Sequence, residues 1–353
     1  MGPVSGSGVG SPAAVSAPPV PRLHGVDVAR GLAIVGMLLV DNRGGNAIGR
    51  QLVHAPWHGL RVADVVFPVF LLLVGVSMPF SRRAQRPRAA LLRVVRLTVL
   101  GWLVVTAKYG FGGVATGVLG HIAGAYLLCW LLLRLPRRAQ VPVAAGVLLT
   151  IGLVSVLLPP PGAGHPSLTP ELSWAAWSDR TVGVSFSAEA PHSYLPSAAT
   201  VFTGVLAGRA LQRHGAAAVR RLAAGALAPL AVGLLLAPVL PVNKRLWTPS
   251  YVLVTGGIGL LVLAAALWLV DTRGWRRPFP QLEVLGRNAI VAFVVSELLF
   301  GAVLDDVLRP VLVRELTRWA GAPVAAWVWA LASVAVVWSV CAALAHRGVV
   351  VRV

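Results

Sequence analysis

Ten long apolar segments, separated by short polar or arginine-rich stretches, constrain the fold of this sequence more than any other feature. Most approach the length of about 20 residues that an α-helix needs to cross a bilayer. Lipid offers no partner to an exposed backbone polar group, and the period-two alternation of a membrane β-barrel is absent, so helices are predicted. We therefore expect an all-α, polytopic bundle of about ten transmembrane helices. The segments cover approximately residues 27–41, 62–80, 94–107, 114–133, 141–158, 196–211, 222–240, 250–270, 288–304 and 324–345.

The charge content agrees with a membrane protein. Only 12% of the 353 residues are charged, whereas 57% are apolar. A soluble globular protein is about 25% charged, so this composition excludes a soluble enzyme, a coiled coil and a disulfide scaffold. The net charge of +19 comes mainly from 29 arginines. They lie in short runs between apolar segments, which is typical of the positive-inside rule and not of a nucleic-acid-binding face.

The basic residues also predict the orientation. With the N-terminus in the cytoplasm and ten alternating spans, 21 basic residues fall on the cytoplasmic side and 10 on the other side. This excess predicts cytoplasmic termini in a multi-pass protein of the cytoplasmic membrane, surrounded by lipids. Residues 1–21 are predicted to be a disordered low-complexity tail, and residues 22–353 a single transmembrane domain. The amphipathic segment 305–323 is expected to lie flat at the interface.

Polar residues at the outer ends of the first two segments are the first candidates for chemistry. The orientation brings Asp41, Asn42, His54 and Asp64 to one mouth of the bundle. A histidine can act as a base or a nucleophile near neutral pH, and a carboxylate can orient it. From the residues alone, an ordinary polar loop with capping Asp and Asn side chains is the alternative.

A metal site at this loop is not predicted. His54 and His58 have the i,i+4 spacing of a zinc pair, but Pro56 between them argues against a regular helix, and no third ligand is evident.

Three polar residues in later apolar segments can each be interpreted in two ways. Glu297 and His121 are either functional or make hydrogen bonds between helices, and Asn288 is either functional or a helix cap. At this stage the pattern fits a membrane enzyme and a transporter of a small molecule or lipid-linked sugar equally well.

Several polar stretches form a more specific pattern. They read Gly-Val-Asp-Val-Ala-Arg-Gly at 25–31, Val-Asp-Asn-Arg-Gly at 40–44, His-Ala-Pro-Trp-His-Gly at 54–59, Ala-Asp-Val-Val-Phe-Pro at 63–68, Pro-Val-Asn-Lys-Arg-Leu-Trp at 241–247 with Ser-Tyr-Val at 250–252, and Leu-Gly-Arg-Asn-Ala-Ile at 285–290. In this order they resemble the heparan-α-glucosaminide N-acetyltransferase family over most of the chain.

The resemblance implies a transmembrane acyltransferase. Members take an acetyl group from cytosolic acetyl-CoA and pass it to the amine of a glucosamine or similar amino sugar on the far side. The family's active-site histidine falls on His54, as a base or a transient acyl carrier, and its loop asparagine on Asn42, a candidate oxyanion donor; Asp64 would hold the imidazole tautomer. Inner arginines are expected near the CoA phosphates. Further candidates around the substrates are Asp41, Trp57, His58, His121, Asn243, Asn288 and Glu297.

Three departures from the family pattern concern the acceptor more than the acyl transfer. Residues 189–194 read Glu-Ala-Pro-His-Ser-Tyr where the family carries an acidic Asp-Pro-Glu-Gly-like stretch. His121 follows a glycine where the family has Gln-Arg, and Ser296 stands where it often has His. The acceptor, the acyl chain length and the oligomeric state, a homodimer included, are therefore left open by the sequence.

Overall fold

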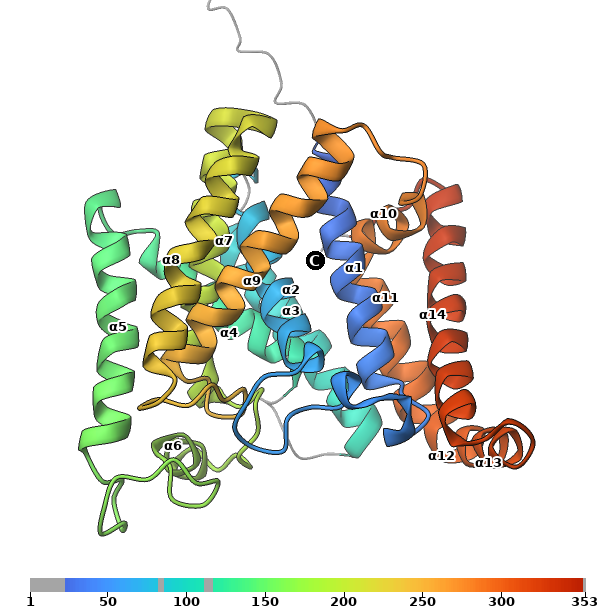
Figure 1. Ribbon diagram of the computed structural model, residues 1–353, viewed down its shortest axis with the longest axis horizontal. Helices are drawn as coiled ribbons and strands as arrows, with labels where there is room; N and C mark the ends of the chain where they lie inside the picture. The colour runs from blue at the N-terminus through green and yellow to red at the C-terminus, as the bar shows by residue number, and fades with distance from the viewer. Residues whose placement is uncertain (1–22, 82–85, 111–116, 352–353) are drawn as a thin grey trace, which may run out of the picture.

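A computed structural model describes residues 23–81, 86–110 and 117–351. In these residues every regular element is a helix (Figure 1). The tail predicted to be disordered, residues 1–21, lies outside the described residues. The all-α prediction is confirmed for the described part of the chain.

Each of the ten apolar segments falls on a helix. Within the described residues, α3, α5, α8, α14 and the segment formed by α9 and its π-helical continuation are long and apolar enough to cross a membrane, and α2 and α4 are shorter apolar helices. The number of ten spans and the orientation stay predictions. The helices are α1 (His24–Asp41), α2 (Val62–Ser77), α3 (Pro87–Tyr109), α4 (Val118–Leu132), α5 (Arg137–Leu157), α7 (Tyr194–His214), α8 (Ala218–Leu236), α9 (Pro249–Leu267), α11 (Ala289–Val295) and α14 (Ala322–His346).

Shorter helices connect them, and some boundaries differ from the sequence prediction. Helix α3 begins well before residue 94, since Pro87 occupies its first turn, where a missing N–H costs nothing. The segment 288–304 is not one α-helix, because α11 passes into a π-helix at Ser296–Leu304; such segments are frequent at functional sites. The other connecting elements are α6 (Trp174–Thr181), the π-helix Trp268–Thr272, α10 (Pro280–Arg287), α12 (Asp305–Val307), α13 (Arg309–Ala320) and the 3-10 helices Asn46–Ile48, Arg50–Leu52, Pro191–Ser193 and Gly215–Ala217.

Glycines let the helices that carry the site approach closely. A Cβ on Gly75 of α2 would overlap the Val201 carbonyl of α7, and one on Gly204 of α7 would overlap the Leu72 carbonyl of α2. Gly31 makes a similar approach, between α1 and α10. Small residues allow such contact where lipid supplies no hydrophobic drive for helix association. The position of α2 is thereby fixed against α7.

A proline in α2 ties the same helix to α9. Pro68 has no N–H, so the carbonyl of Asp64 loses its helical partner. The fully buried Tyr251 of α9 donates its hydroxyl to this carbonyl at 2.7 Å. The first turn of α2, which carries the Asp64 carboxylate, is held in place by this bond.

The long loops gather at one end of the bundle. Figure 1 shows the chain between α1 and α2, the segment around α6 and the connection from α8 to α9 together at its lower end. Helix α13 lies across the lower end of α14 at a steep angle to it. Its placement at a membrane interface stays a prediction. The loops at this end carry His54.

Candidate active site

A histidine–aspartate pair forms the centre of the site. His54 Nδ1 lies 2.8 Å from Asp64 Oδ1, and the Asp64 side chain is only 1% exposed. The second carboxylate oxygen accepts the backbone N–H groups of Ala55 at 3.1 Å and Arg61 at 3.0 Å. Because an ionised carboxylate only accepts hydrogen bonds, the His54 proton resides on Nδ1 and the lone pair on Nε2. Nε2 therefore carries the lone pair that a base or a nucleophile needs.

Local sequence explains why this pair forms. Asp64 occupies the third position of α2, where an acidic side chain reaches back to the N-cap backbone N–H. The Arg61 guanidinium donates to the carbonyls of Val53 at 3.2 Å and His54 at 3.0 Å. The loop that carries the imidazole is thus fastened to the start of the helix that carries the carboxylate.

A small cavity of about 70 Å³ opens beside the imidazole. Its ionisable lining residues are Asp41, His54, Glu189 and Lys244. Lys244 Nζ lies 3.4 Å from His54 Nε2 and 4.0 Å from Glu189 Oε1. The cavity thus joins a histidine lone pair, one ammonium group and two carboxylates from four separate stretches of the chain.

The loop between α8 and α9 places Lys244. Buried Asn243 accepts the backbone N–H of Leu246 at 2.9 Å and donates its own N–H to Thr248 at 3.1 Å. Trp247 is fully buried, has a left-handed backbone with φ of 49°, and donates Nε1–H to Ala188 at 2.7 Å. Such a conformation is costly for a bulky residue and persists only where the surroundings enforce it. Buried hydrogen bonds therefore hold this loop in place and tie it to the segment that carries Glu189.

Trp57, His58 and Asn243, three of the further candidates, lie near one another. The Asn243 amide donates to His58 Nδ1 at 3.2 Å. Partial burial lowers the pKa of His58 below its ordinary value of 6.5, which favours the neutral ring that accepts this bond. The Trp57 and His58 rings lie 5.8 Å apart. The Arg245 guanidinium lies over the Trp57 ring at 5.5 Å.

Two other candidates are engaged elsewhere. Asn42 is buried and donates its amide to Ser296 at 2.7 Å. Glu297 forms an ion pair with Lys108 at 3.0 Å, for which Gly301 leaves room. The Glu297 carboxylate is therefore paired, and the asparagine side chain links the end of α1 to the π-helix.

His121 and Asn288 also make structural contacts. His121 is fully buried, lies 3.1 Å from the Ser193 hydroxyl and packs edge-on against Phe67. Asn288 is the residue between α10 and α11, and its Oδ1 accepts the backbone N–H of Val351 at 3.2 Å. The structure thus brings Asp41 and Asp64 to His54, and gives His121 and Asn288 other partners.

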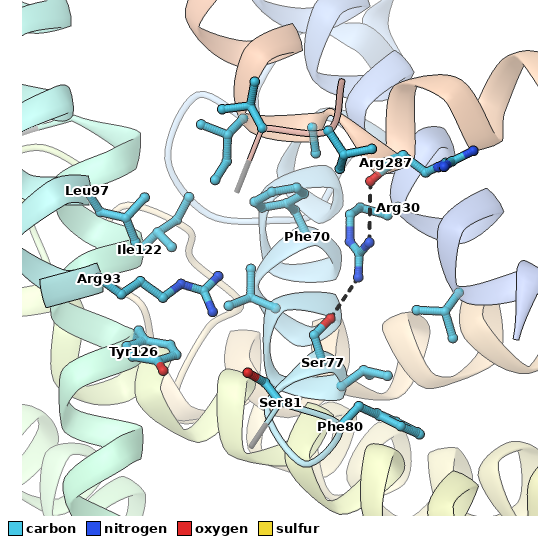
Figure 2. Close-up of a pocket in the computed structure, with 18 of the residues that line it drawn as sticks. Arg30, Phe70, Ser77, Phe80, Ser81, Arg93, Leu97, Ile122, Tyr126 and Arg287 are labelled. Carbon is cyan, nitrogen blue, oxygen red and sulfur yellow. Dashed lines mark hydrogen bonds between the residues drawn. The ribbon is translucent and has the colours of Figure 1, made fainter. Parts of the chain in front are cut away.

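A large cavity of about 1200 Å³ lies further along the same helices. In Figure 2 Arg93 and Tyr126 stand on one side, Arg30 and Arg287 on the other, and Phe70 between them. Arg30 is held by the Ser77 hydroxyl at 2.7 Å, and Arg93 lies over the Tyr126 ring at 4.7 Å. Among the described residues that line it, the arginines are Arg30, Arg86, Arg93, Arg96 and Arg287, and the acidic one is Asp27.

The two cavities are stacked along α2 and α4. On α2, Phe67 lines the small cavity and Phe70 the large one. On α4, Val118 and Ile122 do the same. Three or four residues of helix rise about 5–6 Å. One helical turn therefore separates the arginine-lined cavity from the one beside His54.

Comparison with known proteins places this geometry in a family. The catalytic family described as heparan-alpha-glucosaminide N-acetyltransferase matches residues 22–237, more than half of the chain. The chain belongs to this family. The matched part contains His54, Asp64 and Glu189, whereas Lys244 and Glu297 lie beyond it. The resemblance drawn from the sequence is confirmed.

Two curated relatives carry the family name. The human heparan-alpha-glucosaminide N-acetyltransferase is 44% identical over 61 residues, which are 17% of this chain and 9% of that protein. The mouse protein of the same name is 24% identical over 354 aligned positions, covering 79% of this chain and 54% of that protein. The chain thus spans about half the length of the mouse relative.

Three charged residues near the site were not among the candidates predicted from the sequence. Lys244 and Glu189 line the cavity beside His54, and Lys108 pairs with Glu297. A signal was present, because Lys108 and Lys244 are the chain's two lysines among 31 basic residues. In the structure both lysines lie at the end of the bundle that holds His54, and each is paired with a carboxylate, Lys108 with Glu297 and Lys244 with Glu189.

Proposed function

We propose that this protein is a membrane N-acetyltransferase that moves an acetyl group from acetyl-CoA on one side of the bilayer to a primary amine on the other. The acceptor class is an amino sugar or glycan, and the membrane is the cytoplasmic membrane. The observation that carries the proposal is the stacking of the two cavities, one rich in arginine and one opening on the lone pair of His54 Nε2. Membership of the family supports the same reaction.

The large cavity is suited to the donor. Coenzyme A is polyanionic, and arginine binds phosphate with a planar fork of donors. In the described part of its lining, five arginines and one aspartate give the cavity a positive charge. Its volume of about 1200 Å³ suits an extended ligand. We place the phosphates among these arginines and the thioester toward Phe67 and Phe70.

The chemistry belongs to His54. As a base, Nε2 takes a proton from the attacking amine while the amine nitrogen bonds to the acyl carbon and the C–S bond breaks. As a carrier, Nε2 itself attacks the acyl carbon, the C–S bond breaks and the thiolate leaves. The amine then bonds to the acetyl carbon, the bond from that carbon to Nε2 breaks, and the freed Nε2 takes the amine proton. In both routes Asp64 keeps the proton on Nδ1 and stabilises the charged ring.

The acceptor enters from the loop end of the bundle. Asp41 and Glu189 line the small cavity and suit an ammonium group, the form of most primary amines at neutral pH. This group passes one proton to the Asp41 carboxylate, and the neutral amine then attacks. Trp57 and Phe186, whose rings lie 6.2 Å apart, present aromatic surface three positions along the chain from His54 and Glu189. These features support an amine on a sugar or another group with an apolar face.

The test uses purified protein in proteoliposomes with radiolabelled acetyl-CoA outside and glucosamine inside. Wild type should form labelled N-acetylglucosamine, and His54→Ala should abolish this product without changing the thermal unfolding midpoint. His165→Ala, an exposed histidine at the same end of the bundle, is the matched control. Transfer that survives His54→Ala contradicts the mechanism, and uptake of unmodified substrate without product supports a transporter instead.

A further inference from the structure

The proposed acetyl transfer needs a hydrogen-bond donor that faces the acyl oxygen. When a nucleophile adds to a thioester carbonyl, negative charge develops on the oxygen, and a fixed donor about 2.7–3.1 Å away supplies the largest electrostatic stabilisation. Asn42 was the sequence-based candidate for this role. Its amide instead donates to Ser296 at 2.7 Å in a buried position. Another donor has to be sought beside His54.

Lys244 meets this requirement. It is the only basic side chain, apart from His54 itself, among the described residues that line the small cavity. Its Nζ lies 3.4 Å from His54 Nε2, the atom beside which the acyl carbon must lie in either route. An ammonium group carries three donors and no acceptor. A carbonyl oxygen one bond from that carbon falls within reach of Nζ.

We propose that Lys244 is a catalytic residue whose ammonium group binds the acyl carbonyl oxygen and stabilises the tetrahedral intermediate. This inference rests on the proposed acetyl transfer. As the amine nitrogen bonds to the acyl carbon, the carbonyl π pair moves to the oxygen facing Lys244, and Nε2 takes the amine proton. On collapse the pair re-forms the carbonyl and the C–S bond breaks. The thiolate leaves with the bonding electrons and takes the proton from Nε2.

Glu189 is the positioning residue for Lys244. In the structure Nζ donates to the lone pair of Nε2, so Lys244 must release that lone pair when substrates bind. Glu189 Oε1 is 4.0 Å from Nζ, and both side chains are largely buried, with exposed fractions of 27% and 13%. The carboxylate therefore keeps the ammonium group in the cavity while its hydrogen bond passes from the histidine to the acyl oxygen.

The surrounding backbone suits this role. Hydrogen bonds of Asn243 and Trp247 hold the loop of Lys244 in place. The Trp247 indole N–H donates to the carbonyl of Ala188, the residue before Glu189. A preorganised donor costs no reorganisation during the reaction, which is the condition for effective oxyanion stabilisation. The chain keeps lysine here although 29 of its 31 basic residues are arginine. A compact point charge fits a cavity of about 70 Å³ better than a planar guanidinium.

The test compares kcat and KM of wild type, Lys244→Met, Lys244→Arg, Glu189→Gln and His54→Ala, with acetyl-CoA and glucosamine as substrates. Lys244→Met should lower kcat by about 10²–10³-fold with little change in the KM for acetyl-CoA, since an oxyanion contact acts only in the transition state. Lys244→Arg should restore part of kcat, because it keeps a charged donor. Arg314→Met, which removes an exposed charge on α13, should leave both constants unchanged.

The outcomes separate the two proposals. If wild type transfers acetyl and His54→Ala does not, the proposed function stands. Lys244→Met with wild-type kcat then overturns this inference alone. Equal losses in kcat for Glu189→Gln and Lys244→Met also overturn it, because they indicate an ion pair with a structural role. If Lys244→Met lowers the unfolding midpoint, the decision passes to Lys244→Arg, whose failure to exceed Lys244→Met in kcat overturns the inference. A wild type without any transfer overturns both proposals.

Discussion

One oxygen of the Asp64 carboxylate accepts His54 Nδ1–H at 2.8 Å, while the other accepts the N-cap N–H of α2 at 3.0 Å. The side chain that caps the start of α2 is thus the side chain that orients the imidazole. Helix geometry and catalytic geometry are coupled through a single buried side chain. A change at Asp64 must therefore be judged by activity and stability together.

Replacing Asp64 with asparagine tests this coupling. The amide keeps the shape but loses the charge, and its NH₂ group favours the tautomer with the lone pair on Nδ1. We expect kcat to fall on the order of 10⁴-fold, the loss that follows when a triad carboxylate becomes an amide. The amide oxygen still accepts the N-cap N–H of Arg61, so the free energy of unfolding should change by less than about 1 kcal/mol. Acetyl transfer and thermal unfolding measure the two effects. A kcat of Asp64→Asn within tenfold of the wild-type kcat would contradict the role of Asp64.

The Tyr251 hydroxyl should matter only because of Pro68. Tyr251→Phe leaves the buried Asp64 carbonyl without a donor and should cost about 1–3 kcal/mol of unfolding free energy. In a Pro68→Ala background the new backbone N–H can satisfy the carbonyl, so the same change should cost less. Unfolding midpoints of the two single variants and the double variant measure the difference. Equal costs in both backgrounds would show that the hydroxyl acts in another way.

The glycine contact between α2 and α7 should be intolerant of any side chain. Gly204→Ala places a Cβ against the Leu72 carbonyl, and overpacking of this kind costs about 1–3 kcal/mol. Gly146→Ala in α5 is the matched control, because its Cβ meets no atom within 4 Å. That change should stabilise the helix slightly, by about 0.5–1 kcal/mol. Thermal unfolding in detergent compares the two, and equal midpoints would refute the close approach.

Arginines of the large cavity should govern donor binding and leave the chemical step unaffected. Arg93→Gln removes a charge far from the acyl carbon, so KM for acetyl-CoA should rise about tenfold at constant kcat, the effect of losing roughly 1.4 kcal/mol. Arg314→Gln at the other end should change neither constant. Raising the salt concentration should narrow the gap between wild type and Arg93→Gln, since screening weakens phosphate contacts. An unchanged KM would place the donor elsewhere.

Much of the fold could be predicted from the sequence. The ten apolar segments coincide with helices because lipid forces each segment to satisfy its own backbone hydrogen bonds. The pairing of His54 with Asp64 was also within reach, because His54 lies in the loop just before α2 and Asp64, ten positions later, lies in the first turn of that helix. The break of 288–304 into α11 and a π-helix was not predicted, since apolar composition does not distinguish the two helical forms.

Only the tertiary structure decided which polar groups surround the imidazole. Lys244 and Glu189 reach His54 from loops 190 and 135 positions away, through helices whose crossings depend on single glycines such as Gly204. Asn42, adjacent to Asp41 in sequence, turns to Ser296 because successive helical residues point in different directions. Local sequence determines helices and their caps, whereas contacts between distant loops follow from how the helices pack.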